Sequence, residues 1–168
     1  MAKKSKVGLK VPTANDMAKK YGSMIKLASE VTDTDLYIPS TFFALNYLFG
    51  KGIPYGKIVE IAGEESSGKS LVAYNFAYAT QQLGGHVIWV DAEQSWMNSW
   101  AEINGVDPAR VTIVNDTRIE YIADVVADLA IYLRSQLTHN EPILLVIDSI
   151  AATDCTDTVS YTHLTLPT

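Results

Sequence analysis

The chain has 168 residues, of which 48% are hydrophobic and 19% charged, a composition typical of one soluble globular domain. Its single cysteine excludes an intrachain disulfide framework, and no apolar run reaches the roughly 20 residues of a membrane-spanning helix, so we expect a cytoplasmic protein without membrane partners. The formal net charge is −6, but residues 1–26 hold seven Lys and one Asp, so the acidic average does not exclude a nucleic-acid partner.

The first 35 residues predict one helix followed by a linker. Apolar residues recur at helical spacing between Asn15 and Glu30, which is typical of an amphipathic helix. Lysines from Lys3 to Lys26 surround this helix and are candidates for contacts with DNA phosphates. A solvated tail is the alternative interpretation of the same residues.

Strands and helices alternate in the centre of the chain, after a short extended piece at residues 36–39 and a helix over residues 42–49. The predicted strands are residues 57–62, 86–91, 111–114 and 143–148, and the predicted helices are residues 70–83, 96–103 and 119–137. Continuously apolar strands that alternate with helices indicate a parallel sheet buried on both faces. The expected fold class is therefore α/β.

A phosphate-binding motif follows the first predicted strand of this sheet. Glycines in such a loop let backbone N–H groups turn toward a phosphate, and the start of the next helix adds its positive dipole end. Lys69 is expected to reach the β- and γ-phosphates, and Ser70 to join the shell of Mg²⁺. The pattern G-x-x-x-x-G-K-[ST] is matched by Gly63, Glu64, Glu65, Ser66, Ser67, Gly68, Lys69 and Ser70. The strand and helix flanks favour nucleotide binding over a chance match.

Carboxylates at two further strand ends extend this predicted site. Asp148 ends the strand 143–148, where ligands of open α/β sheets bind, and is expected to hold Mg²⁺. The alternative is that Asp148 caps the turn after the strand. Glu93 follows the strand 86–91 at the same edge, where a carboxylate can deprotonate the water that attacks a γ-phosphate. A solvated loop carboxylate is the alternative there.

Several ordered segments, together with these motifs, resemble the ATPase core of the RecA recombinase family, including its phage UvsX-type members. Between residues 38 and 153 they are G-K-I-V-E-I before the loop, V-D-A-E-Q, N-G-V-D-P and V-I-D-S-I-A-A. The resemblance implies a truncated P-loop NTPase core of RecA type that binds ATP and Mg²⁺. It also implies a recombinase that forms homo-oligomeric filaments on single-stranded DNA in homologous recombination and DNA repair.

The resemblance also implies roles for single residues. It makes Glu93 the catalytic base and Trp100, seven residues later, the aromatic that stacks on adenine; an ordinary helix-core tryptophan is the alternative for Trp100. Met97 and Asn98 stand where the family usually has an acidic residue and a proline. The helix within residues 1–35 is implied to pack on a neighbouring protomer, with an ordinary surface helix as the alternative.

The carboxyl-terminal residues depart from this pattern. Beyond Ala152 nothing matches the family, so we expect residues 36–158 to be a partial core, with single-stranded DNA bound through regions missing from this chain. Residues 159–168 have no charged side chain and resemble the translation of a sequencing adapter, so we expect them to be non-native. A genuine polar coil is the alternative.

Two other functions share parts of this pattern. A hexameric replicative helicase or a clock-type ATPase has the same order of strand, phosphate loop and acidic residue. A phosphotransferase for a small metabolite needs a lid with arginines over the phosphates. The arginines of the chain, Arg110, Arg118 and Arg134, lie outside obvious lid positions.

Overall fold

The computed structural model describes residues 35–155. The helices are α2 (Phe43–Phe49), α3 (Lys69–Gln82), α4 (Asn98–Ile103) and α5 (Ile119–Gln136), with short 3₁₀ turns η3 (Pro108–Arg110) and η4 (Ile150–Ala152). The strands are β1 (Tyr37–Ile38), β2 (Ile53–Pro54), β3 (His86–Asp91), β4 (Val111–Val114) and β5 (Ile143–Asp148). The predicted helix at residues 15–30 and the predicted foreign tail at residues 159–168 lie outside the described residues.

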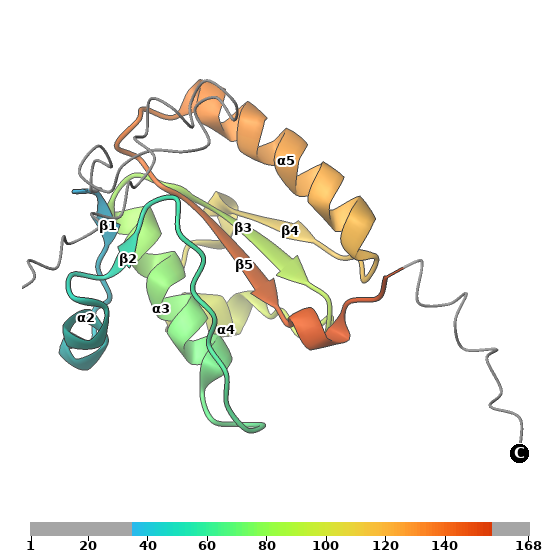
Figure 1. Cartoon of the computed structure of the whole chain (residues 1–168), viewed down its shortest axis with the longest axis horizontal. Coiled ribbons are helices and arrows are strands. Elements are labelled where there is room, and N and C mark those ends of the chain that lie inside the picture. Colours follow the sequence, from blue (N-terminus) through green and yellow to red (C-terminus); the bar gives the residue numbers. More distant parts are fainter. Residues whose placement is uncertain (1–34, 156–168) are drawn as a thin grey trace, which may run out of the picture. The chain divides into compact units, whose positions relative to one another are not determined.

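A parallel sheet in the order β4-β3-β5 forms the centre of this part of the chain (Figure 1). Its register places Val87 opposite Val111, and Asp91 opposite Asp148, so β3 and β5 end level with each other. The α/β class with a parallel sheet is therefore confirmed. Among the helices of residues 35–155, none combines the length and hydrophobicity that crossing a bilayer requires.

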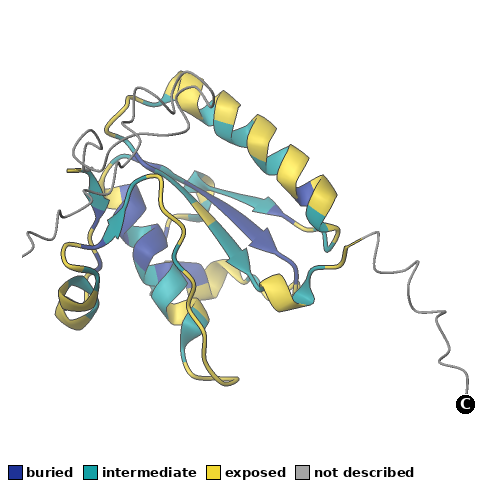
Figure 2. Ribbon diagram, in the orientation of Figure 1, coloured by how far each residue is buried: buried dark blue, intermediate teal, exposed yellow. Residues whose placement is uncertain are grey.

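Alternating residues of β3 supply the core on both faces of the sheet. Val87 and Trp89 point to the face covered by α3 and α4, and Ile88 and Val90 point to the face covered by α5. All four are almost completely buried, and β3 is the most deeply buried strand in Figure 2. The two-faced burial explains why β3 is apolar without interruption.

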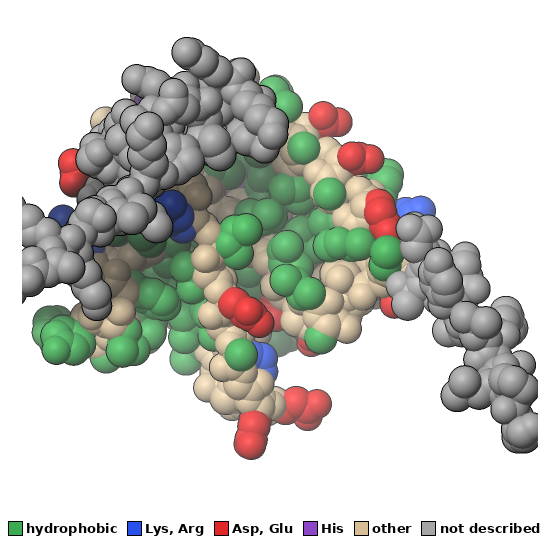
Figure 3. Space-filling model, viewed as in Figure 1, with side chains coloured by type: hydrophobic (Ala, Val, Ile, Leu, Met, Phe, Trp, Pro, Cys, Tyr) green, Lys and Arg blue, Asp and Glu red, His purple; other side chains and the backbone are tan. Residues whose placement is uncertain are grey.

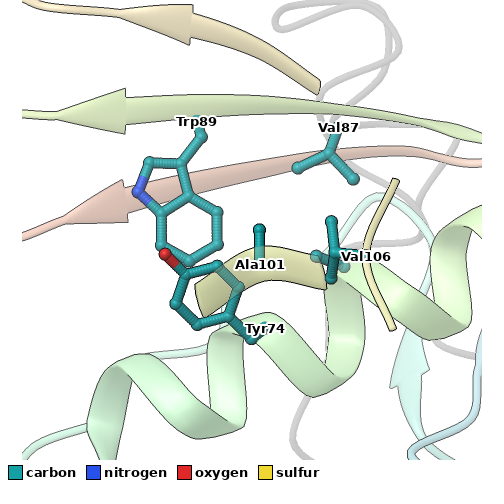
Figure 4. Packing of buried hydrophobic residues seen from close by; sticks show 6 residues of the cluster. Tyr74, Val87, Trp89, Ala101 and Val106 are labelled. Atoms are coloured by element: carbon teal, nitrogen blue, oxygen red, sulfur yellow. The ribbon is translucent and has the colours of Figure 1, made fainter. Parts of the chain in front are cut away.

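Aromatic packing dominates the face beneath α3 and α4. Tyr74 of α3 lies against Trp89 of β3 with ring centroids 4.7 Å apart, and Ala101 of α4 packs beside them (Figure 4). Trp96, in the turn after β3, contacts Tyr74 in a tilted arrangement and Trp89 edge-on, with ring centroids 5.4 and 5.1 Å apart. Close aromatic pairs of this kind add to the stabilisation that burial alone provides. The cluster fixes α3 and the turn after β3 against one strand.

The predicted strand at residues 57–62 is not a strand in the structure. This segment has no ladder partner among the described residues, and the side chain of Ile58 is 100% exposed. Within residues 35–155, β5 pairs with β3 alone, and Leu145 in its centre stays 43% exposed. Hydrophobic side chains also lie exposed on the face shown in Figure 3. An apolar run forms a strand only where a neighbouring strand takes its backbone hydrogen bonds, and none is described here.

Candidate functional site

The start of α3 and the ends of β3 and β5 meet at one edge of the sheet. Because β3 and β5 are parallel and in register, the residues after Asp91 and at Asp148 leave the sheet side by side. The hydroxyl of Ser70, in the first turn of α3, reaches the end of β5. This edge therefore brings together the phosphate loop and both strand-end carboxylates that the sequence singled out, and it is where ligands of open parallel sheets bind.

The phosphate loop turns sharply into α3. Gly68 caps the helix with φ of +93°, a left-handed conformation that favours glycine. A Cβ at Gly63 would lie 2.7 Å from Ser67 Oγ, so the backbone is also close there. The residues between these glycines are exposed; they are Glu64, Glu65, Ser66 and Ser67. The loop leaves the first N–H groups of α3 free of side-chain caps, as a phosphate site requires.

Lys69 folds back over this loop. Its Nζ donates hydrogen bonds to the carbonyl oxygens of Gly63, at 3.0 Å, and Glu64, at 2.8 Å. A lysine ammonium offers three donors on a flexible stem, so these bonds can be exchanged for bonds to phosphate oxygens. The charged group lies within the loop that would surround a phosphate.

Ser70 and Asp148 form an oxygen pair across the site. Ser70 Oγ donates to Asp148 Oδ2 at 2.8 Å, although the two residues are 78 positions apart. A hydroxyl and a carboxylate are the oxygen ligands that Mg²⁺ accepts when the substrate phosphates and water supply the rest. No group of three or more His, Cys, Asp or Glu side chains that could hold a metal ion is found in residues 35–155.

Glu93, in the turn after β3, lies at the same edge of the sheet. Its Oε1 accepts a hydrogen bond of 2.6 Å from Ser149 Oγ, in the residue that follows Asp148. Glu93 is exposed, and no hydrogen bond to its second carboxylate oxygen is described within residues 35–155, so that oxygen can accept one from a water molecule. The sequence did not single out Ser149 because a serine after a strand is usually a turn residue.

Asp91 shapes the turn that carries Glu93. Its side chain is only 3% exposed and accepts 2.9 Å hydrogen bonds from the backbone N–H groups of Ser95 and Trp96. Within the turn, Gln94 takes a left-handed φ of +53° and donates to the Asp91 carbonyl at 3.3 Å. This role of Asp91 was not predicted from the sequence. The available signal was an aspartate at a strand end before a turn, because such side chains often accept hydrogen bonds from nearby backbone N–H groups.

The electrostatic potential at this edge of the sheet is negative. Burial, together with the negative charges of Asp148 and Asp91, raises the pKa of Tyr74 to about 12. The two carboxylates disfavour a negatively charged Tyr74, and the same charges favour a cation that binds near them. The site therefore suits a divalent cation that is shared with phosphates.

Trp100 lies in α4 with 44% of its surface exposed, so the alternative of a buried helix-core tryptophan does not describe it. Asn98 Oδ1 accepts a hydrogen bond of 2.8 Å from Trp96 Nε1, and Met97 is exposed. The side-chain oxygen of Asn98 is therefore engaged in holding Trp96. Stacking of Trp100 on a base remains a prediction.

Comparison with known proteins identifies the family. The model of the RecA N-terminal domain matches residues 11–160. The chain is 37% identical over 132 residues to Protein RecA of Nocardioides sp., 36% over 132 residues to that of Mycolicibacterium vanbaalenii, and 31% over 131 residues to that of Gloeothece citriformis. Each match covers 78% of this chain and 35–36% of the relative, so the chain spans about a third of their length. By its matched domain and its parallel α/β core, the chain belongs to the RecA family.

Proposed function

We propose that the chain is the amino-terminal part of an ATP-dependent DNA recombinase. The observation that carries the proposal is the meeting, at one sheet edge, of the phosphate loop, the Ser70–Asp148 pair and Glu93. Family membership supports the same activity, and the matched relatives bear the name Protein RecA. These names favour a recombinase over a hexameric helicase, a clock-type ATPase or a metabolite phosphotransferase.

The phosphates of ATP would be bound by residues 63–70. The backbone N–H groups of the loop and of the first turn of α3 would donate to phosphate oxygens, and Lys69 would exchange its carbonyl partners for the β- and γ-phosphates. Ser70 and Asp148 would hold Mg²⁺, which when bound neutralises charge on the transferring phosphate. Trp100 would stack on the adenine.

Glu93 would serve as the general base for hydrolysis. Its carboxylate would accept a proton from water while the water oxygen bonds to the γ-phosphorus. The bond between that phosphorus and the oxygen shared with the β-phosphate breaks, and ADP leaves with the electron pair. The open oxygen of Glu93, opposite its hydrogen bond to Ser149, is the group suited to this proton transfer.

Different segments of the chain would have different roles in such a recombinase. Residues 1–35 would contribute a helix to assembly of a homo-oligomeric filament, and residues 36–158 would form a partial ATPase core. Residues 159–168 would be foreign to the gene. Single-stranded DNA would be gripped by regions beyond this chain, in the cytoplasm of a bacterium or of its phage-infected host, during recombination and repair.

Substitution of Lys69 in the full-length gene product tests the proposal. Because Lys69 would contact the phosphates directly, Lys69→Ala should abolish ATP hydrolysis stimulated by single-stranded DNA, measured as phosphate release. Lys57→Ala is the matched control, since Lys57 is an exposed lysine before the loop and should leave turnover unchanged. A Lys69→Ala protein that hydrolyses ATP like the Lys57→Ala control would contradict the proposed site.

A further inference from the structure

Two adjacent residues at the end of β5 touch both halves of the site. Asp148 accepts a hydrogen bond from Ser70 in α3, and the next residue, Ser149, donates one to Glu93 after β3. We infer that Ser149 is a positioning residue, which holds the water-activating carboxylate of Glu93 at a fixed place beside the metal aspartate. The inference rests on the proposed function, because it assigns a task to Ser149 in that same hydrolysis.

The need for such a residue follows from how Glu93 is held. Asp91 fixes the backbone of the turn through the N–H groups of Ser95 and Trp96, and none of the hydrogen bonds described for its side chain reaches the side chain of Glu93. A glutamate side chain turns about three bonds, and that of Glu93 is exposed. A general base must stay within hydrogen-bond reach of its water, so free rotation would lower the rate. The 2.6 Å bond from Ser149 Oγ supplies the missing restraint on the side chain.

Serine suits this task chemically. Its hydroxyl donates one hydrogen bond to Oε1, and the carboxylate keeps further lone pairs, including those of the other oxygen, for water. The bond therefore orients Glu93 without consuming the proton-accepting capacity that the reaction needs. Because Ser149 directly follows Asp148, the position of the base is also tied to the strand end that would hold Mg²⁺.

Variants of the full-length protein test the inference, because it predicts a change in kcat without a change in the Kd for Mg·ATP. Ser149→Ala should lower kcat for ATP hydrolysis about tenfold, since one hydrogen bond to a charged group is lost. Its Kd for Mg·ATP should stay within about twofold of the parent, because binding does not use Glu93. Ser149→Thr keeps the hydroxyl and should restore most of the parent kcat. Thr153→Ala is the matched control, since the Thr153 hydroxyl donates only to the Ile150 carbonyl of its own turn, at 2.8 Å.

The outcomes separate this inference from the proposed function. If Glu93→Gln cripples hydrolysis while Ser149→Ala turns over at the parent rate, Glu93 remains the base and the role of Ser149 is overturned. Equal losses of kcat in Ser149→Ala and Ser149→Thr would also overturn it, because the hydroxyl would then not be the cause. If Glu93→Gln hydrolyses ATP at the parent rate, Glu93 is not the base, and both the proposed mechanism and the role of Ser149 are overturned. Circular dichroism of each variant checks that it is folded.

Discussion

Strand β3 and residues 57–62 have similar sequences and opposite environments. H-V-I-W-V-D and K-I-V-E-I-A each hold four apolar residues in six, yet Trp89 in β3 is 1% exposed and Ile58 is 100% exposed. β3 has a strand on each side and a helix layer on each face, whereas residues 57–62 have no strand partner among the described residues. A hydrophobic pattern thus indicates that a segment can be buried. Whether the segment is buried depends on the strands and helices that pack against it.

The largest effect expected from this comparison is at Trp89. Trp89→Ala removes the ring that packs against Tyr74 and Trp96, so the unfolding free energy of the 168-residue chain should fall by about 3–5 kcal/mol. Urea denaturation followed by circular dichroism measures this change. A loss below about 1 kcal/mol would show that β3 is not the centre of the core.

A smaller effect is expected at the end of β3. Asp91→Asn keeps the size of the side chain but replaces an ionised acceptor of two N–H groups, which should cost about 1.5–3 kcal/mol in the same urea titration. Ser95→Ala is the control, because it removes only a 3.4 Å hydroxyl contact and leaves the Ser95 N–H in place. Equal effects of the two changes would assign the turn to the serine hydroxyl instead.

The start of β3 should give the chain a pH dependence. Burial lowers the pKa of His86 below its ordinary value of 6.5, and the nearby cation of Arg110 lowers it further. The unfolded chain then binds the proton more readily, so this contribution to stability is full above pH 6.5 and is lost as the pH falls below it. Urea midpoints at several pH values should fall less steeply in His86→Gln than in the parent. Identical slopes would mean that His86 is solvated in the folded chain.

The smallest effect is expected within residues 57–62. Ile58→Ala should change the unfolding free energy of the 168-residue chain by no more than about 0.5 kcal/mol, as for other surface positions. The same urea titration measures it beside Trp89→Ala. A loss of about 2 kcal/mol or more would erase the contrast between the two segments, because it would require Ile58 to be buried.

Elements with a long periodic pattern or an uninterrupted apolar run were predicted best from the sequence. Helix α5 was predicted at residues 119–137 and is Ile119–Gln136, and β3 and β5 have the predicted bounds. The extended piece predicted at residues 36–39 contains β1. The sheet order β4-β3-β5, strand β2 and the pairing of β1 with β2 were not predicted, because order and such short pairs leave no periodic signal. The strand at 57–62 was wrong because the pattern cannot show whether a partner strand is present.

The sequence could single out some residues of the candidate site and not others. The loop 63–70, Asp148 and Glu93 could be singled out because their chemistry is tied to fixed spacing after a strand, and their roles stay predictions. Asp91 and Ser149 were missed because their partners lie four and five residues on, or 56 residues away, and depend on how the strands are arranged. The residues that orient a site follow from tertiary structure more than from a motif.

The central claim is that Glu93 activates water at the edge where β3, β5 and α3 meet. The most direct measurement is ATP turnover by Glu93→Gln in the full-length protein, together with its Kd for Mg·ATP. We predict a loss in kcat of about a hundredfold or more, because a general base typically contributes this much, with nucleotide binding retained. Turnover at the parent rate by a folded Glu93→Gln protein would contradict the claim.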